Sequence, residues 1–346
     1  MHRICGSLAG AGYEVCLVGR KLKDSKNLVE KSFSQKRLSC FINKGFLFYL
    51  EYNLRLFFYL LTQKTDAICA IDLDTILPCL LVSKLKKTKR VYDAHEYFTE
   101  LKEVRTRKWV RWIWLKVEAF AVPQFKNGYT VSKGLADAFY DKYGRSYELI
   151  RNMPVLKSFI KKQRSSKQLY YQGAVNEARG FEFLIPAMKN IPYKLVICGD
   201  GNFMQQLKML IKENDVEDKI ELLGMRPPEE LQLYAAQATL GMGLAESEGL
   251  NQYMALPNKF FDYMHEGLPQ VAMNYPEYIR INNEFKVAVL LDNLDPDTIS
   301  QTINRIMQDD ALLKNMQENC LKAREIYNWS SEEKKLLTFY NNLFNE

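Results

Sequence analysis

Short apolar segments alternate with longer amphipathic segments along most of the 346 residues. A short apolar run bounded by turn residues is typical of a buried strand, and an amphipathic segment is typical of a helix. Strands and helices in turn predict parallel sheets that helices cover on both faces. The predicted strands are 15–19, 67–71, 90–93, 128–131, 147–150, 169–171, 194–198, 220–222, 240–242, 270–273 and 287–291.

The length suits two α/β domains rather than one. Residues 157–168 are polar and rich in lysine and serine, and this change in composition predicts a domain boundary. We therefore predict one Rossmann-like domain over 1–155 and a second over 166–322, facing each other across a cleft. The helix over 323–346 is predicted to cross back to the first domain.

The first residues do not follow the expected order. Residues 1–12 have the pattern of a helix that has already begun, and the strand at 15–19 follows them. A doubly wound domain normally begins with a strand. We therefore expect that the usual first strand is absent from the chain as given.

Composition narrows the classes of partner. The net charge of +7 fits an anionic ligand or an anionic membrane surface, whereas its dispersal and the lack of a nucleic-acid motif argue against nucleic acid. The seven cysteines have no Cys-x-x-Cys spacing and read as core residues in a reducing cytoplasm. With only three histidines, we predict no metal site. Neither a signal peptide nor a membrane-spanning helix is predicted.

Two helical segments bear on membrane contact. Residues 41–61 are apolar except for a narrow polar stripe, so we predict a mostly buried core helix, with membrane contact as the alternative. Residues 102–116 interleave arginines and lysines with tryptophans. This pattern fits an anionic membrane interface, and it also fits a solvated basic helix that packs its tryptophans inward.

Parallel sheets bind ligands at the carboxyl ends of their strands. The first such loop runs from Gly173 to Arg179, where a guanidinium offers two donors to phosphate oxygens. The second holds Gly199 and Gly201, and small residues there let a nucleotide approach the backbone and a helix start. His95 follows the strand at 90–93, where an imidazole can bind a substrate hydroxyl.

A further loop and helix follow the strand at 240–242. The loop carries Glu246 and Glu248, and Asn258 is predicted to cap the next helix. Lys259 and Asp262 are three residues apart, so they share one face near the helix start. A cation and a carboxylate there suit a phosphate and a ribose hydroxyl. The alternative is an ordinary capped helix beside a solvated acidic loop.

Four segments together resemble bacterial family-four retaining glycosyltransferases of the GT-B fold, in the order of that family. They are residues 131–136, 171–180, 196–201 and 255–264. The resemblance implies two Rossmann-like domains, a UDP- or GDP-linked sugar donor on the second, and a glycan, glycolipid or lipid-linked acceptor on the first. It also implies hexosyl transfer with retention of anomeric configuration in polysaccharide biosynthesis, with neither a metal nor a cofactor besides that donor.

The resemblance also implies roles for single residues. Arg179 matches the second member of a basic pair that clasps the diphosphate, and Asp262 matches an acid that contacts ribose. His95 matches a histidine near the transferred sugar, and Glu248 is the nearest match to the acid beside the donor sugar, with Glu246 behind it. The donor-binding set is completed by the glycines and the start of the helix at 258: Gly173, Gly199, Gly201, Asn258 and Lys259.

The chain departs from the family pattern at three points. Ala174 stands where the first basic residue is expected, and we predict that Lys259 supplies the missing charge. The two acids are separated by more than the usual spacing, and the first strand is missing. A non-catalytic nucleotide-sugar-binding subunit and a nucleotide-sugar epimerase therefore remain alternatives. The transferase is expected in the cytoplasm, peripheral at the inner face of the cell membrane.

Overall fold

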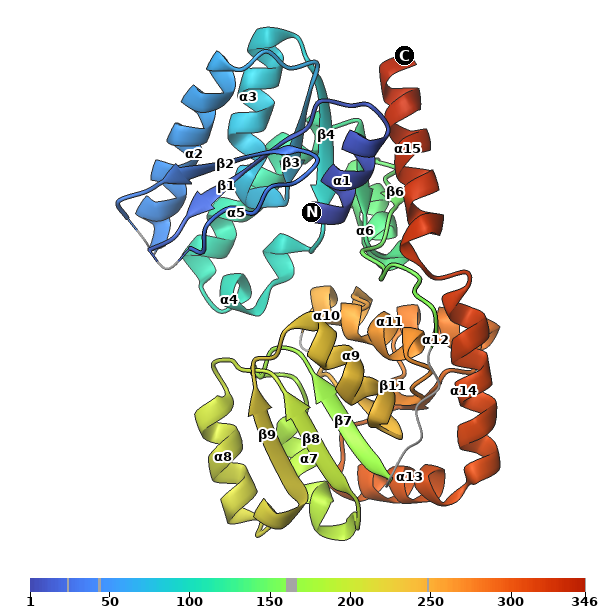
Figure 1. Cartoon of the computed structure of the whole chain (residues 1–346). Helices are drawn as coiled ribbons and strands as arrows, with labels where there is room; N and C mark the ends of the chain where they lie inside the picture. Colours follow the sequence, from blue (N-terminus) through green and yellow to red (C-terminus); the bar gives the residue numbers. More distant parts are fainter. Residues whose placement is uncertain (24, 43–44, 160–166, 248, 346) are drawn as a thin grey trace. The chain divides into compact units, whose positions relative to one another are not determined.

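The computed structural model describes residues 1–23, 25–42, 45–159, 167–247 and 249–345. Contacts between Cα atoms divide the chain into two compact units, which are described separately (Figure 1). Unit 1 comprises Met1–Arg151 and Ser331–Glu346, and unit 2 comprises Asn152–Ser330. Part of the predicted boundary segment, 160–166, lies outside the described residues.

The strands of unit 1 form two parallel sheets. A two-stranded sheet has the order β1-β2, and a four-stranded sheet has the order β3-β4-β5-β6. Sequence analysis missed β2 because its residues alternate polar side chains without an apolar face, as is common at a sheet edge. The bounds are β1 Cys16–Lys21, β2 Ser34–Ser39, β3 Ala67–Ile71, β4 Lys89–Ala94, β5 Asn127–Thr130 and β6 Glu148–Leu149.

Helices connect these strands, and the last helix of the chain packs in unit 1. Ser132 caps α6, since its hydroxyl accepts a hydrogen bond from the Leu135 amide at 3.2 Å. The bounds are α1 His2–Gly10, α2 Gly45–Thr62, α3 Ile76–Lys86, α4 Lys102–Arg105, α5 Lys108–Ala121, α6 Lys133–Tyr143 and α15 Trp329–Asn345. Single 3₁₀ turns occupy Leu73–Thr75, Phe98–Glu100 and Val122–Gln124.

Unit 2 has one parallel sheet of six strands in the order β12-β11-β10-β7-β8-β9. The change of direction falls at β7, from which successive strands run first to one side and then to the other, as in a doubly wound fold. The bounds are β7 Gln168–Gln172, β8 Lys194–Cys198, β9 Ile220–Gly224, β10 Leu240–Gly243, β11 Gln270–Met273 and β12 Ala288–Leu291.

The helices of unit 2 lie between these strands in the sequence. Sequence analysis missed the two helices α10 and α12: it placed α10 within the acidic loop before Asn258, and it made no prediction for the residues of α12. The bounds are α7 Phe181–Ala187, α8 Met204–Glu213, α9 Pro228–Gln237, α10 Leu250–Met254, α11 Asn258–His265, α12 Pro276–Glu284, α13 Pro296–Gln308 and α14 Asp310–Arg324. Single 3₁₀ turns occupy Met188–Asn190 and Glu217–Lys219. Both units therefore confirm the predicted parallel α/β fold.

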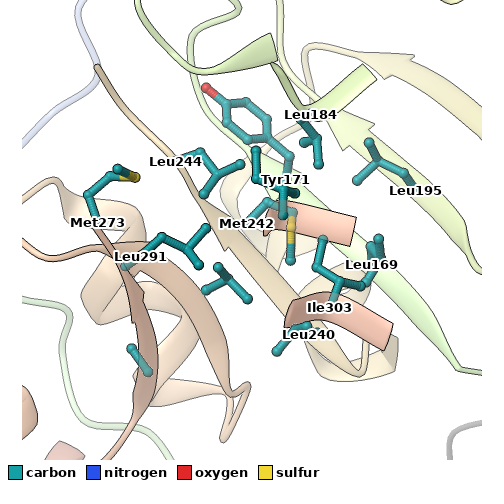
Figure 2. Close-up of a cluster of buried hydrophobic side chains, with 14 of the residues drawn as sticks. Leu169, Tyr171, Leu184, Leu195, Leu240, Met242, Leu244, Met273, Leu291 and Ile303 are labelled. Atoms are coloured by element: carbon teal, nitrogen blue, oxygen red, sulfur yellow. The ribbon is translucent and has the colours of Figure 1, made fainter. Parts of the chain in front are cut away.

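The core of unit 2 lies on both faces of β7. Leu169 and Tyr171 point to one face, where they join a large apolar cluster that includes Met242 and Ile303 (Figure 2). Tyr170 points to the other face and packs against the Tyr263 ring of α11. This alternation is the normal period of a strand, and burial on both faces fixes the register of β7 at the centre of the sheet.

One burial prediction is wrong. The segment 41–61 was expected to be a mostly buried helix, but α2 exposes one apolar side along its length. Leu54 and Phe58 are 50% and 63% exposed, whereas Leu56 and Leu60 are buried. A helix that is apolar on every side but a narrow polar stripe does not reveal from sequence which of its sides meets the sheet.

Candidate functional site

The loops that follow β7, β8 and β10 lie together at one edge of the six-stranded sheet. These three strands are hydrogen-bonded neighbours and run parallel, so their carboxyl ends meet at the same edge. The loop after β7 begins at Gly173, and the loop after β8 begins at Gly199. Unit 2 therefore gathers most of its predicted site residues in one place.

The two glycine-containing loops pack against each other through their backbones. The Gly173 amide donates to the Cys198 carbonyl, and the Val175 amide donates to the Asp200 carbonyl, both at 3.0 Å. A methyl group added at Gly199 would lie 1.8 Å from the Gly173 carbonyl oxygen. Sequence analysis assigned this glycine to close approach by a ligand, and the structure shows that the neighbouring loop already fills that space.

Gly201 also allows the two loops to pack closely. A methyl group there would lie 2.2 Å from the Asn176 side-chain oxygen and 2.3 Å from the Val175 carbonyl oxygen. The Asn202 amide donates to that same Asn176 oxygen at 3.1 Å. The loops after β7 and β8 therefore form one rigid surface, with the exposed residues Gly173 and Ala174 at its outer side.

Lys259 is held against an aromatic ring of the central strand. Its ammonium nitrogen lies 3.8 Å from the centroid of the Tyr171 ring, which is a close cation–π contact. The Tyr171 hydroxyl donates to the Ala174 carbonyl at 2.7 Å. One buried tyrosine thus contacts both the start of α11 and the loop after β7.

A second cation stands near Lys259. Burial, and next to it the charge of the half-buried Arg179 guanidinium, lowers the pKa of Lys259 well below its usual range. Within the described part of the chain, neither side chain has a hydrogen bond or an ion pair with a carboxylate. Two neighbouring cations without a counter-ion repel each other, and a bound anion lowers the free energy of the pair. The pair therefore forms a candidate phosphate site.

Asp262 is held beside this pair, one helical turn after Lys259. Its Oδ2 accepts a hydrogen bond from the Gln172 side-chain amide at 2.8 Å. The Gln172 backbone amide in turn donates to the Tyr263 hydroxyl at 3.0 Å. These contacts fix α11 at the carboxyl end of β7, and the Asp262 carboxylate offers acceptors for a hydroxyl group.

The remaining predicted residues of unit 2 are placed as follows. Asn258 is the exposed first residue of α11, and its side chain makes no capping hydrogen bond because Pro257 occupies the cap position, so the predicted cap is wrong. The half-buried Glu246 donates its amide to the Ala178 carbonyl at 3.1 Å, near Arg179. Glu248 lies outside the described residues. The identity of the acid beside the donor sugar therefore stays a prediction.

In unit 1, His95 lies at the carboxyl end of β4 within an acidic cluster. Its Nε2 lies 3.1 Å from the buried Asp93 carboxylate, and its backbone amide donates to Asp72 Oδ1 at 2.8 Å. The same ring nitrogen is 3.2 Å from the Met1 sulfur. Burial alone lowers the pKa of His95, but Asp93 and Asp72 outweigh it and raise that pKa. The Asp93 carboxylate therefore orients the imidazole, while Asp72 holds the backbone of the same residue.

Sequence analysis assigned no role to four side chains that position this chemistry: Tyr171, Gln172, Asp72 and Asp93. The two aspartates end the neighbouring strands β3 and β4, so the rule for carboxyl ends of parallel strands could have found them. Tyr171 ends a predicted strand and Gln172 follows it, but an aromatic residue in a strand usually indicates a core position. The sequence carries no signal for a contact between a strand and a distant helix.

We expect Asp72→Asn to change the pH dependence of stability. Burial raises the pKa of Asp72 to about 7, from an ordinary 3.8, so the folded chain holds a proton that the unfolded chain loses. The stability present below pH 4 is therefore lost as pH rises towards 7. Because Asp72 titrates together with His95, we expect a loss of about 2 kcal/mol.

The asparagine keeps the acceptor for the His95 amide but cannot ionise. The variant should be about 2 kcal/mol more stable than the wild type at pH 8 and nearly equal to it at pH 4. Urea unfolding at both pH values measures this, with the exposed Asp141→Asn as the matched control. An unchanged pH dependence in Asp72→Asn would contradict the assignment.

The fold and this site define an α/β protein of the GT-B class. The structure is similar to sucrose-phosphate synthase (tll1590) from Thermosynechococcus elongatus, with a TM-score of 0.81, 18% identity, and coverage of 99% of this chain and 92% of that one. It is also similar to Anabaena Alr3699/HepE in complex with UDP, with a TM-score of 0.74 and 14% identity. That match covers 95% of this chain and 100% of the other.

Residues 154–323 match the family model described as glycosyl transferases group 1. A curated relative, D-inositol 3-phosphate glycosyltransferase of Corynebacterium urealyticum, is 26% identical over 193 residues. The match spans 52% of this chain and 44% of that relative. The predicted resemblance to a GT-B glycosyltransferase is confirmed, while retention and membership of family four stay predictions.

Proposed function

We propose that the protein transfers a hexosyl group from a UDP- or GDP-linked donor to a glycan, glycolipid or lipid-linked acceptor in polysaccharide biosynthesis. The observation that carries the proposal is the pair of cations, Arg179 and Lys259, beside Asp262 at the carboxyl edge of the second sheet. The proposed location is the cytoplasm, peripheral at the membrane. Retention of anomeric configuration is part of the proposal.

Each side chain of the site has a role in this reaction. The bond between the anomeric carbon and the phosphate oxygen breaks, and negative charge develops on the diphosphate, where Arg179 and Lys259 stabilise it. The acceptor oxygen forms the new bond on the same face, and the departing phosphate oxygen takes its proton. Asp262 accepts hydrogen bonds from ribose hydroxyls. The two cations supply the charge that a metal would otherwise provide.

The solved neighbours support a uridine nucleotide as the first donor to test. Structures of Anabaena Alr3699/HepE hold UDP and, in another case, UDP-glucose. The carboxyl edge of the six-stranded sheet in this chain has the loops, cations and carboxylate that such a ligand requires. His95 is proposed to bind a hydroxyl of the transferred sugar, and Glu248 is proposed as the acid beside it.

Ala174 supports a second candidate, a non-catalytic subunit that binds the nucleotide sugar. The alanine is exposed and offers no side-chain donor where the family is expected to carry arginine. The contact of Lys259 with the Tyr171 ring places a replacement charge near this loop, which favours turnover. An epimerase has no such specific support in the site.

Assay of a panel of nucleotide sugars tests the proposal. The purified chain is incubated with UDP- and GDP-linked hexoses and a lipid-linked acceptor extract, and both transfer and donor hydrolysis are measured. We expect transfer from at least one donor, with the product in the configuration of the donor. Nucleotide binding without turnover would support the binding subunit, and conversion of the donor sugar without transfer would support an epimerase.

A further inference from the structure

Three helices of unit 1 expose large apolar side chains on the surface of the unit. On α2 these residues are Leu47, Leu50, Leu54 and Phe58, and each is 46–63% exposed. Their spacing of three, four and four residues places them on one side of the helix. The opposite side carries the buried core residues of the same helix, so α2 is apolar on both sides.

The helix α5 repeats this arrangement with tryptophans. Trp109 and Trp112 are 80% and 55% exposed, and Phe120 follows on the same side of the helix. Lys116 belongs to the same side, and its ammonium lies 5.9 Å from the centroid of the Trp112 ring. Trp114 points elsewhere and packs against the rings of Phe98 and Tyr49. The predicted inward packing of tryptophans therefore holds for Trp114 but not for Trp109 or Trp112.

The helix α3 also exposes apolar side chains. Leu81 and Leu85 are 46% and 66% exposed and lie one turn apart. Strands β3, β4 and β5 follow one another across the sheet in parallel, and right-handed crossovers place their connecting helices α3 and α5 on the same face. The helix α2 packs beside α3, as Figure 1 also shows. We call the outer side of these three helices the apolar–basic face.

Exposed cations interrupt the apolar residues of this face and border it. They are Lys84, Lys87, Arg105, Arg107, Lys108 and Lys116. The carboxylates nearby are fewer, and three of them are engaged. Glu51 pairs with Arg55 at 2.8 Å, and Glu118 is buried with Lys142. Glu100 pairs with Arg111 at 2.5 Å and with Arg105 at 3.7 Å. Glu103 is exposed among them. The face therefore carries an excess of positive charge together with large apolar side chains.

We propose that the apolar–basic face of α2, α3 and α5 docks on the surface of an anionic lipid bilayer. Apolar side chains enter the boundary between headgroups and acyl chains, and tryptophans favour that depth. Lysines and arginines bind the anionic headgroups, each strengthening binding about fivefold. Among the described residues, no helix is long and apolar enough to span a bilayer, so the docking is to one surface.

The charge of the face selects lipid over a second copy of the chain. A two-fold dimer through this face would bring its lysines and arginines against the same residues of the partner, and like charges repel. An anionic bilayer neutralises them. The inference adds a partner to the proposed function, since a lipid-linked acceptor lies at such a surface, but docking itself requires no turnover.

Vesicle binding tests the docking. The full chain is sedimented with vesicles of phosphatidylcholine alone or mixed equally with phosphatidylglycerol, at low and raised salt. We expect at least about tenfold tighter binding to the anionic vesicles, and weaker binding at raised salt. Phosphatidylglycerol with brominated acyl chains should quench the fluorescence of Trp109 and Trp112, and Trp109→Phe/Trp112→Phe should lose most of that quenching.

Variants of the face are compared with a matched control. Leu54→Glu/Phe58→Glu and Trp109→Glu/Trp112→Glu are each expected to weaken vesicle binding about tenfold or more. Met209→Glu/Met225→Glu changes two side chains of unit 2 that are 60% and 75% exposed and should bind vesicles like the wild type. All variants should retain UDP binding and circular dichroism, which shows that they fold.

Several outcomes would overturn the docking. They are a wild type that does not bind anionic vesicles, face variants that bind as the wild type does, and a dimer in solution that the same variants dissociate. Transfer to a soluble acceptor is assayed without vesicles on the same samples. Loss of transfer with retained vesicle binding would count against the proposed function alone, and the reverse would count against the docking alone.

Discussion

Replacing both Arg179 and Lys259 with alanine is expected to lower kcat/KM for sugar transfer by about three orders of magnitude or more. The diphosphate gains negative charge as the sugar leaves, so cations that face it bind the transition state more tightly than the donor. Removal of one such electrostatic donor typically costs about 100- to 1,000-fold. Steady-state kinetics with the best donor of the panel measures the effect.

The single variant Lys259→Ala separates this charge from a structural role. Burial and Arg179 lower the pKa of Lys259 in the free protein, and a bound diphosphate favours the charged ammonium. Binding is therefore coupled to proton uptake, and the affinity for UDP should fall as pH rises above the lowered pKa of Lys259. Titration calorimetry in buffers of different ionisation enthalpy measures the protons taken up.

Lys259→Ala should weaken UDP binding about tenfold or more at pH 7 and abolish the proton uptake. The exposed Lys212→Ala on α8 is the matched control and should change neither quantity. Donor affinity that is unchanged in Lys259→Ala would show that this lysine does not replace the basic residue absent at position 174. A proton uptake that persists in Lys259→Ala would assign it to another group.

The alternation of apolar strands and helices was sufficient to predict the parallel α/β fold. Every predicted strand has a counterpart, because buried parallel strands such as Lys194–Cys198 are continuous apolar runs. The strand β2 was not predicted because Ser34–Ser39 lies at a sheet edge and is polar. The exposed side of α2 was not predicted because an apolar helix gives no amphipathic pattern to orient it.

Sequence analysis predicted some residues of the candidate site and missed others, and the structure gives a physical reason for the difference. The rule that ligands bind at strand carboxyl ends selects positions along the chain, so it found Arg179 and His95. It says nothing of contacts between elements that are distant in sequence. The stacking of Lys259 on Tyr171 and the hydrogen bond from Gln172 to Asp262 are such contacts. They depend on how α11 packs on β7, which no local pattern records.

The packing of the loops after β7 and β8 makes Gly199→Ala the substitution with the largest expected effect on stability. A methyl group at this position would lie 1.8 Å from the Gly173 carbonyl oxygen and 3.0 Å from its carbonyl carbon. Both neighbours are backbone atoms and cannot rotate away, so the loops after β7 and β8 must separate. Overpacking of a well-packed region costs roughly 1–3 kcal/mol, and we expect about 4 kcal/mol for this backbone clash.

Thermal and urea unfolding of Gly199→Ala measure this loss, and titration with UDP measures its consequence for the site. Separation of the loops breaks the hydrogen bond from the Gly173 amide to the Cys198 carbonyl and moves the segment that leads to Arg179, so UDP binding should fall with stability. Gly6→Ala in α1 is the control: nothing lies within 4 Å of the added methyl group, and alanine favours the helix by about 1 kcal/mol. Wild-type stability in Gly199→Ala would mean that the two loops are not packed as described. Wild-type stability together with lost UDP binding would instead return Gly199 to the role first predicted for it, close approach of the nucleotide to the backbone.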